Sequence, residues 1–288
     1  MASQRRRPGR PFLAALAGAL AVVAVVSGGC GGGEELVIGV ASSVQDSGLM
    51  DALIDEFKAQ NPEIGSIKAV PGGSGQLLEM ARRGELDAII THSPGDEERF
   101  VADGEGVDRR PFMQNFFVLV GPEDGPAGSG QLSRSVSAFT AIASTGAKFV
   151  SRGDQSGTHV RELAIWEEAG IDPSGEPWYQ ESGVSQGANL QVASDKGAYT
   201  LTDSATWTAL QDDVELVLYV TDTQEPNVYS LTRVNPDKHK VNEEAALAFA
   251  DFVASAAGQA VIEEFGVEDY GEPLFVAGGL TPTPAATP

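Results

Sequence analysis

The run 36-LVIGVA-41 is a continuous apolar stretch of strand length that leads directly into the polar residues 42–48. A strand without apolar–polar alternation is typical of a parallel sheet that is covered on both faces. Apolar residues then recur at helical spacing from Leu49 to Phe57, and Asn61-Pro62 ends the pattern. The sequence therefore predicts a strand, a loop and a helix in direct succession.

The same order recurs along the chain. We expect further buried strands over 67–70, 86–91, 116–122, 148–150 and 214–220, with helices between several of them, including one over 159–169. A Gly/Ser/Pro-rich break at 123–133 indicates a crossing into a second domain, and a late helix that starts after Asn242 predicts a return to the first. Strands that alternate with helices indicate an α/β fold with a mainly parallel sheet.

Three polar loops, 42–48, 72–75 and 152–158, share a composition rich in Ser and Gly, and each lies between a strand-like run and a helical run. The start of a helix offers unpaired backbone N–H groups and the positive end of its dipole, and glycine lets a ligand approach the backbone closely. Ser, Gly and Asp are also ordinary turn and N-cap residues. Because three such loops occupy equivalent positions, they predict a cradle for a small oxyanion.

The first 29 residues have the order of a secretory signal peptide: four Arg, then an apolar run, then small residues up to Cys30. The only cysteine of the chain stands where lipoproteins carry their lipidated cysteine, so we expect lipidation of Cys30, a tether over 30–35 and a location on the outer face of the cytoplasmic membrane. An uncleaved membrane anchor is the alternative. A disordered Pro-rich tail is expected over 277–288.

The formal net charge of the chain is −22, and it becomes −26 when the four Arg of the leader are removed. Such a surface repels nucleic acid and anionic membranes, which excludes them as partners. A single cysteine excludes disulfides, and three histidines make a transition-metal cation site improbable.

Several longer motifs resemble the periplasmic tungstate-binding proteins of ABC importers. The most specific are 149-FVSRGDQSGTH-159, 106-GVDRRP-111 and 198-AYTLTD-203, and the likeness extends over roughly 36–276. The resemblance implies a type II solute-binding fold, in which two lobes, each a mainly parallel sheet flanked by helices, are joined by two crossover strands. It places lobe 1 at 36–114 plus 228–276 and lobe 2 at 115–227.

The resemblance also implies the site. Arg152 and Thr158 match the family's Ser-Arg-Gly-Asp-x-Ser-Gly-Thr motif. The stretch Val40-Ala41-Ser42-Ser43 stands where the family has Thr-Thr-Thr-Ser and keeps two of its four hydroxyls. The loop 182–188 departs from the family's Gly-Gln-Gly-Met-Gly, so only backbone donors are expected there. The expected oxyanion ligands are Ser42, Ser43, Ser74, Arg152, Ser156, Gly157, Thr158, Ser185 and Thr200.

The implied function is capture of tungstate, or of molybdate, for the permease and ATPase of an ABC importer by a monomer that needs no cofactor and is not an enzyme. Phosphate is the main alternative, because a protonated phosphate rewards an acceptor such as Asp154 in the site, whereas tungstate near neutral pH needs donors only. A hydrolase would need a base beside its nucleophile, but His159 comes without a G-x-S-x-G turn. An adhesion lipoprotein, suggested by Arg152-Gly153-Asp154, would bind no small ion.

Overall fold

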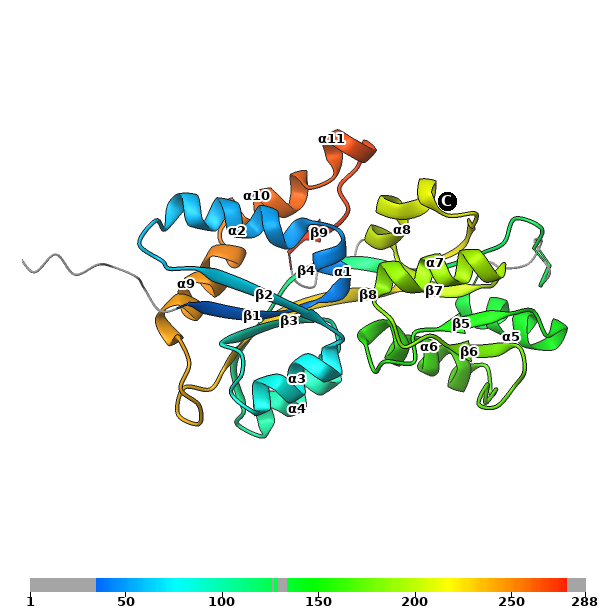
Figure 1. The fold of residues 1–288 in the computed structure, drawn as a ribbon, viewed down its shortest axis with the longest axis horizontal. Coiled ribbons are helices and arrows are strands. Elements are labelled where there is room, and N and C mark those ends of the chain that lie inside the picture. Colours follow the sequence, from blue (N-terminus) through cyan, green and yellow to red (C-terminus); the bar gives the residue numbers. More distant parts are fainter. Residues whose placement is uncertain (1–34, 126, 129–133, 279–288) are drawn as a thin grey trace, which may run out of the picture. The chain divides into compact units, whose positions relative to one another are not determined.

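The computed structural model describes residues 35–125, 127–128 and 134–278. The predicted signal peptide, the lipidation of Cys30 and the tail over 279–288 lie outside the described residues. Figure 1 gives the arrangement of the elements. In chain order they are β1 (Leu36–Ala41), α1 (Ser42–Asp46), α2 (Leu49–Gln60), β2 (Ile67–Gly72), α3 (Ser74–Arg82), β3 (Ala88–Thr91), α4 (Pro94–Ala102), β4 (Gly106–Gly121), α5 (Ser135–Thr145), β5 (Phe149–Ser151), α6 (Gly157–Glu168), β6 (Tyr179–Glu181), α7 (Gln186–Lys196), β7 (Thr200–Asp203), α8 (Ser204–Leu210), η1 (Gln211–Asp213), β8 (Val217–Val234), α9 (Glu243–Ala254), α10 (Ala256–Glu264), α11 (Val267–Tyr270) and β9 (Val276–Ala277).

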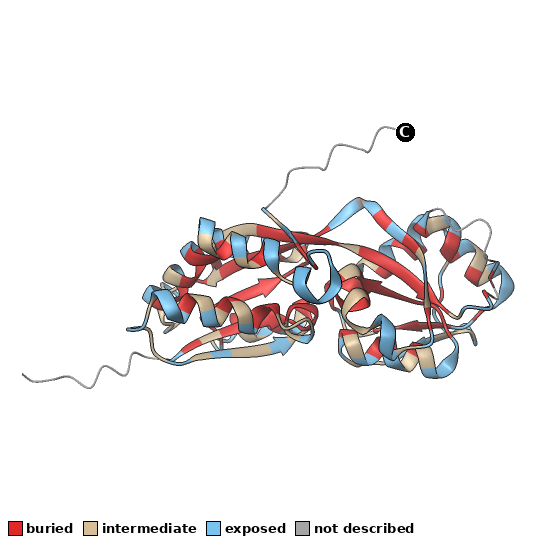
Figure 2. Cartoon of the chain, turned by 90° about the horizontal axis from the view of Figure 1, so that it is seen from above, coloured by how far each residue is buried: buried red, intermediate tan, exposed pale blue. Residues whose placement is uncertain are grey.

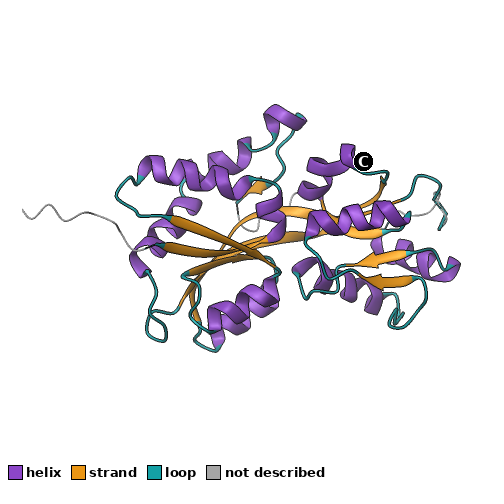
Figure 3. Ribbon diagram, viewed as in Figure 1, coloured by secondary structure: helices purple, strands orange, loops and turns teal. Residues whose placement is uncertain are grey.

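The main sheet has the strand order β2-β1-β3-β8-β4-β7, and β9 is added on β4. The strand β1 pairs in parallel with β2 and β3, as its helical connections require, whereas β8 pairs antiparallel with β3 and β4. The strands β5 and β6 form a second, parallel pair. Helices flank the strands (Figure 3), so the predicted α/β class is confirmed. The main sheet is mixed rather than mainly parallel, because β8 pairs antiparallel with β3 and β4, and β4 pairs antiparallel with β7 and β9.

The two longest strands, β4 and β8, run antiparallel to each other over most of their length. Their register places Asn115 opposite Asn227, at the positions where the sequence predicted the chain to pass between lobes. The next pairs are irregular, because Phe116 faces Pro226 while Phe117 already faces Asp222. A local break of this kind lets paired strands bend or twist. It therefore supports a hinge at this level, although the lobe boundaries stay a prediction.

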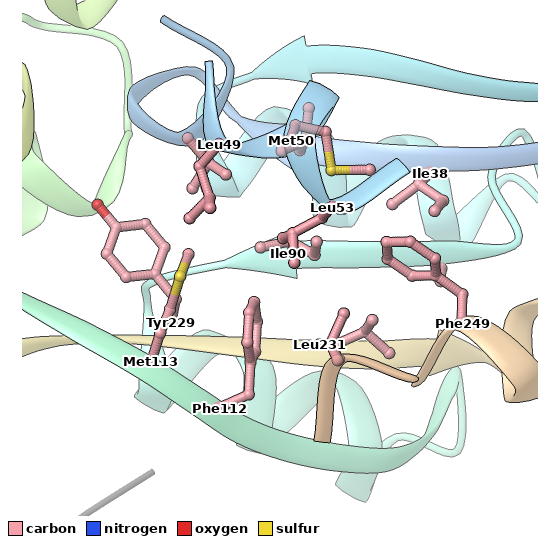
Figure 4. Packing of buried hydrophobic residues seen from close by; sticks show 14 of the residues in the cluster. Ile38, Leu49, Met50, Leu53, Ile90, Phe112, Met113, Tyr229, Leu231 and Phe249 are labelled. Atoms are coloured by element: carbon pink, nitrogen blue, oxygen red, sulfur yellow. The ribbon is translucent and has the colours of Figure 1, made fainter. Parts of the chain in front are cut away.

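Buried residues concentrate along the strands (Figure 2) and form four apolar clusters. The largest packs β1, β3, α2 and α9 together, and Ile38, Leu53 and Phe249 are among its members (Figure 4). Two other clusters lie around β5, α5, α6 and α7. Ala205 on α8, between 115 and 227, belongs to the largest cluster, and the partly buried Ala209 packs against it. The cores are therefore not strictly divided at the predicted boundaries.

Three expectations need correction. The stretch 42–48 is not a loop, because residues 42–46 form the helix α1 directly after β1. Of the strands expected over 116–122 and 214–220, residues 116–121 belong to β4 and residues 217–220 to β8, whereas 122 and 214–216 lie outside them. Both strands continue through polar residues such as Asn115 and Asn227. The tail begins later than residue 277, because Ala277 pairs with Met113 in β9.

In the part of the chain that the structure describes, no single helix is long and apolar enough to cross a membrane. The segments Glu243–Ala254 and Ala256–Tyr270 are long and apolar enough only when taken together, and the chain bends by 60° between them.

Candidate functional site

The loop between β5 and α6 carries Arg152, which is only 2% exposed to solvent. The loop is tightly folded: Gly153 has a φ of +61°, and a Cβ there would lie 2.6 Å from Glu181. Glycine adopts this backbone conformation without strain, and because it has no Cβ it can lie this close to Glu181. The sequence Ser-Arg-Gly-Asp therefore turns sharply after the strand and points the guanidinium inward.

The guanidinium of Arg152 is held on two sides. Its Nη2 donates to Oδ2 of Asp154 at 2.5 Å and to Oγ of Ser42 at 3.3 Å, and its Nη1 donates to Oε1 of Gln186 at 2.5 Å. Its Nε is buried and has no partner among the described residues. A buried N–H without an acceptor costs about 1–3 kcal/mol, so Arg152 has a donor that an incoming acceptor would satisfy.

Asp154 faces Arg152 and the start of α6. Its Oδ2 accepts from Arg152, and its Oδ1 accepts from the backbone N–H of Ser156 at 3.1 Å. Both oxygens therefore already accept hydrogen bonds from the protein, one from Arg152 and one from the backbone at the start of α6. This geometry does not favour Asp154 as the acceptor for a protonated oxyanion.

The helix α6 begins at Gly157 and is capped by Ser156, whose Oγ accepts from the N–H of His159 at 3.3 Å. Gly157 fits closely against His92, because a Cβ would lie 2.6 Å from the imidazole. Thr158 donates its hydroxyl to Oε1 of Gln186 at 3.0 Å. It therefore offers a ligand its backbone N–H in the first turn of α6, and its hydroxyl only after rotation.

The start of α3 lies against the same loop. A Cβ on Gly73 would lie 3.4 Å from the carbonyl oxygen of Asp154, and one on Gly75 would lie 3.2 Å from that of Gln155. Ser74 is fully buried between them, and its Oγ accepts from the N–H of His92 at 3.3 Å. The structure thus brings Ser74 to the loop of Arg152, although Arg152 lies 78 positions later in the chain.

The two serines at the start of α1 point to different partners. Ser42 contacts Arg152, as described, while Ser43 shares a 2.9 Å hydrogen bond with the hydroxyl of Tyr229 on β8. Both are buried. Their helical placement explains the divergence, because neighbouring positions on a helix are turned by about 100° from each other.

Three hydroxyls in this cradle, those of Ser42, Ser74 and Ser156, accept a hydrogen bond from a fixed N–H donor. Each oxygen is thereby oriented and keeps its own hydrogen for another acceptor. Within 35–125, 127–128 and 134–278 the structure records no acceptor for these hydrogens. Together with Nε of Arg152, they form a set of donors that suits a small anion.

Two predicted ligands are not brought to this cradle. Thr200 is buried, but its hydroxyl donates to the carbonyl of Val150 at 2.7 Å and accepts from Asn189 at 2.8 Å, which ties β7 to β5 and α7. Ser185 is exposed, and its side chain makes no capping hydrogen bond at the start of α7. The next residue, Gln186, reaches Arg152 instead.

Gln186 is the main residue that sequence reasoning missed. It is 1% exposed, and besides its contacts with Arg152 and Thr158 its Nε2 donates to Oγ1 of Thr202 at 2.7 Å. The expectation of backbone donors only in the loop 182–188 overlooked this side chain. The available signal was the Gln-Gly pair at 186–187, which the otherwise divergent loop keeps from the family motif.

A buried polar network lies behind the cradle. His92 shares a 2.7 Å hydrogen bond with Asn227, which donates to Asn115 at 2.8 Å and to Tyr229 at 3.0 Å. Burial lowers the pKa of His92 to about 4, so its imidazole is neutral at neutral pH. Arg152 therefore remains the cation of the cradle. His239, by contrast, lies far from it, beside Glu105.

The described residues around the cradle do not form a metal site. Among the described residues no group of three or more His, Cys, Asp or Glu side chains could hold a metal ion. A cavity of about 330 Å³ adjoins the cradle and shares His92 and Gly157 with it, but its other walls include the apolar Phe117 and Val160. Most of the predicted ligand residues therefore belong to the cradle and do not line this cavity.

Comparisons with known proteins show the family of the chain. A model of the PBP superfamily domain matches residues 27–257. The tungstate-binding protein TupA of Peptoclostridium acidaminophilum is 40% identical over 244 residues, which cover 83% of this chain and 84% of that protein.

Two solved structures are similar as well. The tungstate ABC transporter structure from Geobacter sulfurreducens has a TM-score of 0.72 and 36% identity, covering 81% of this chain and 99% of that one. The tungstate-binding protein TupA from Desulfovibrio alaskensis G20 has a TM-score of 0.69 and 32% identity, covering 85% and 99%. These relatives are binding proteins of transporters and not enzymes. The chain belongs to the PBP superfamily, and within it to the family that these tungstate-binding relatives represent.

Proposed function

We propose that this protein captures tungstate outside the cytoplasm and delivers it to an ABC importer. The observation that carries the proposal is the buried guanidinium of Arg152, whose Nε lacks a partner where the starts of α1, α3, α6 and α7 meet. Tungstate is a fully deprotonated dianion near neutral pH, so it needs donors and no acceptor. The relatives named for tungstate support this choice of anion.

The magnitudes are compatible with tight binding. A hydrogen bond to a charged group contributes roughly 1.5–3 kcal/mol. Arg152 Nε, the three oriented hydroxyls and the backbone N–H groups of the first turn of α6 offer at least five such bonds. They can supply the roughly 8–12 kcal/mol of a micromolar to nanomolar site even after the cost of association.

Contacts between residues of the two predicted lobes support a mechanism of closure. Arg152, between 115 and 227, bonds Ser42 outside this range, and the N–H of Gly187 donates to Oδ2 of Asp46 at 3.2 Å. In the proposal, lobe 1 (36–114 with 228–276) and lobe 2 (115–227) rotate about β4 and β8 and trap the anion between them. The importer then recognises the closed form.

The proposal extends to the anchoring. The leader and Cys30 support a monomeric lipoprotein that is held at the outer face of the cytoplasmic membrane by lipid on Cys30. The order of basic, apolar and small residues before Cys30 is the support for this part, and it is independent of the oxyanion site.

A competition titration tests the choice of anion. We expect calorimetry on the purified protein to show tight binding of tungstate, and competition by molybdate, with phosphate and sulfate at least about a hundredfold weaker. The reason for weak phosphate binding is that both oxygens of Asp154 already accept hydrogen bonds. Phosphate binding as tight as tungstate binding would contradict this assignment.

A further inference from the structure

The side chain of Gln186 connects the loop of Arg152 to three other elements. Its Oε1 accepts from Nη1 of Arg152 and from the hydroxyl of Thr158, and its Nε2 donates to Thr202 on β7. Because a guanidinium can only donate, the amide oxygen must face Arg152 and the amide nitrogen must face Thr202. The orientation of the amide is therefore fixed by its partners.

The charge of this partner matters as much as its position. Arg152 already has one carboxylate partner in Asp154, at 2.5 Å. A second carboxylate on the other side of the guanidinium would give the cradle a net negative charge, and a dianion would be repelled at short range in a partly desolvated site. An amide supplies the same acceptor geometry without that charge.

Gln186 lies in the first turn of α7, which contacts two other parts of the site. The following residue, Gly187, donates its N–H to Asp46 of α1, so the first turn of α7 contacts both Arg152 and the start of the chain's first βα unit. A displacement of Gln186 would therefore disturb both the orientation of the guanidinium and the position of α7 against α1.

We propose that Gln186 is a positioning residue for oxyanion binding, which holds Arg152 and Thr158 through a neutral acceptor so that the free Nε of Arg152 faces a dianionic guest. This inference rests on the proposed function, because it assigns a role within the same site. It adds a residue that fixes the geometry and the charge of the site from α7, whereas the ligand donors come from α1, α3 and α6.

Two variants separate positioning from charge. Gln186→Ala removes the acceptor and frees the guanidinium, so tungstate affinity should fall about tenfold, the effect of losing one hydrogen bond of a charged group. Gln186→Glu keeps the shape and both acceptor contacts but adds a negative charge, so affinity should fall about a hundredfold or more. Calorimetric titration with tungstate and thermal unfolding without ligand are measured for each variant.

A purely structural role would give a different order. The isosteric Gln186→Glu would then be the milder change in both measurements, whereas the proposal predicts that it binds worst although it unfolds at a temperature equal to or above that of Gln186→Ala. Gln191→Glu is the matched control, because Gln191 is an exposed residue on the same helix, and it should keep affinity within about twofold.

The outcomes distinguish the two proposals. If the unchanged protein binds tungstate and Gln186→Glu binds it equally well, the role of Gln186 is refuted and the proposed function stands. If affinity falls no further in Gln186→Glu than in Gln191→Glu, the charge argument is likewise refuted. If the unchanged protein binds no tungstate, the proposed function itself fails.

Discussion

Replacement of Arg152 by alanine should weaken tungstate binding by a hundredfold or more, measured by calorimetry on the purified protein. The change removes the buried cation and its unpartnered Nε donor, and each lost hydrogen bond to a charged group is worth roughly 1.5–3 kcal/mol. It also leaves Asp154 without its counter-ion at 2.5 Å, so an unpaired carboxylate faces the dianion.

Two further variants define what Arg152 contributes. Arg152→Lys keeps the charge but loses the planar fork that bonds Asp154, Ser42 and Gln186 together, so an intermediate affinity is expected. Arg83→Ala is the control, because Arg83 is an exposed arginine that pairs with Glu85, and this variant should bind tungstate normally. Equal affinity of Arg152→Ala and Arg83→Ala would remove Arg152 from the site.

The second large effect concerns Glu162, a buried acid on α6. Its Oε1 accepts from the hydroxyl of Tyr179 at 2.8 Å and from the indole of Trp166 at 3.1 Å. Burial raises the pKa of Glu162 to about 7 from an ordinary value of 4.5, against the opposite effect of these hydrogen bonds. The folded protein therefore binds the proton more tightly than the unfolded chain does.

The sign of the pH dependence follows from linkage. Because the unfolded state loses its proton first, the contribution of Glu162 to the free energy of unfolding is complete below about pH 4.5 and is lost as the pH rises toward 7. The loss approaches about 3 kcal/mol, since one pKa unit corresponds to about 1.4 kcal/mol. Glu162→Gln has no such proton, so it should gain stability relative to the unchanged protein between pH 5 and pH 8.

Urea unfolding at both pH values measures this gain. The difference in the free energy of unfolding between Glu162→Gln and the unchanged protein should be larger at pH 8 than at pH 5 by up to about 3 kcal/mol. A difference that is the same at both pH values would mean that Glu162 titrates normally in the folded protein.

The sequence predicted those parts of the fold that depend on local pattern. The apolar run of β1 and the helical spacing of α2 were correct because their periodicity reflects burial on one or two faces. The pairing of β4 with β8 could not be predicted in the same way. Their middle parts carry Asn115, Asn227 and Pro226, which are typical of breaks in a strand. The hydrogen bond between Asn115 and Asn227 joins residues 112 positions apart, which a local pattern does not reveal.

For the candidate site, too, residues were predicted where local sequence suffices and missed where contacts between distant residues decide. Arg152 and Ser74 were predicted because their types and their places before a helix suffice to suggest an anion cradle. Gln186 and Tyr229 were missed, because their roles arise from contacts with Arg152 and Ser43 across long stretches of chain. Thr200 has the right hydroxyl, yet its hydrogen bonds tie β5, β7 and α7 together, which residue type alone cannot indicate.

The most direct measurement is a crystal structure of the protein with tungstate, located by the anomalous scattering of tungsten. We expect one tungsten atom among Arg152, Ser42, Ser74 and the first turn of α6, with an oxygen accepting from Nε of Arg152. A tungsten atom bound elsewhere, with Nε of Arg152 still without an acceptor, would contradict it.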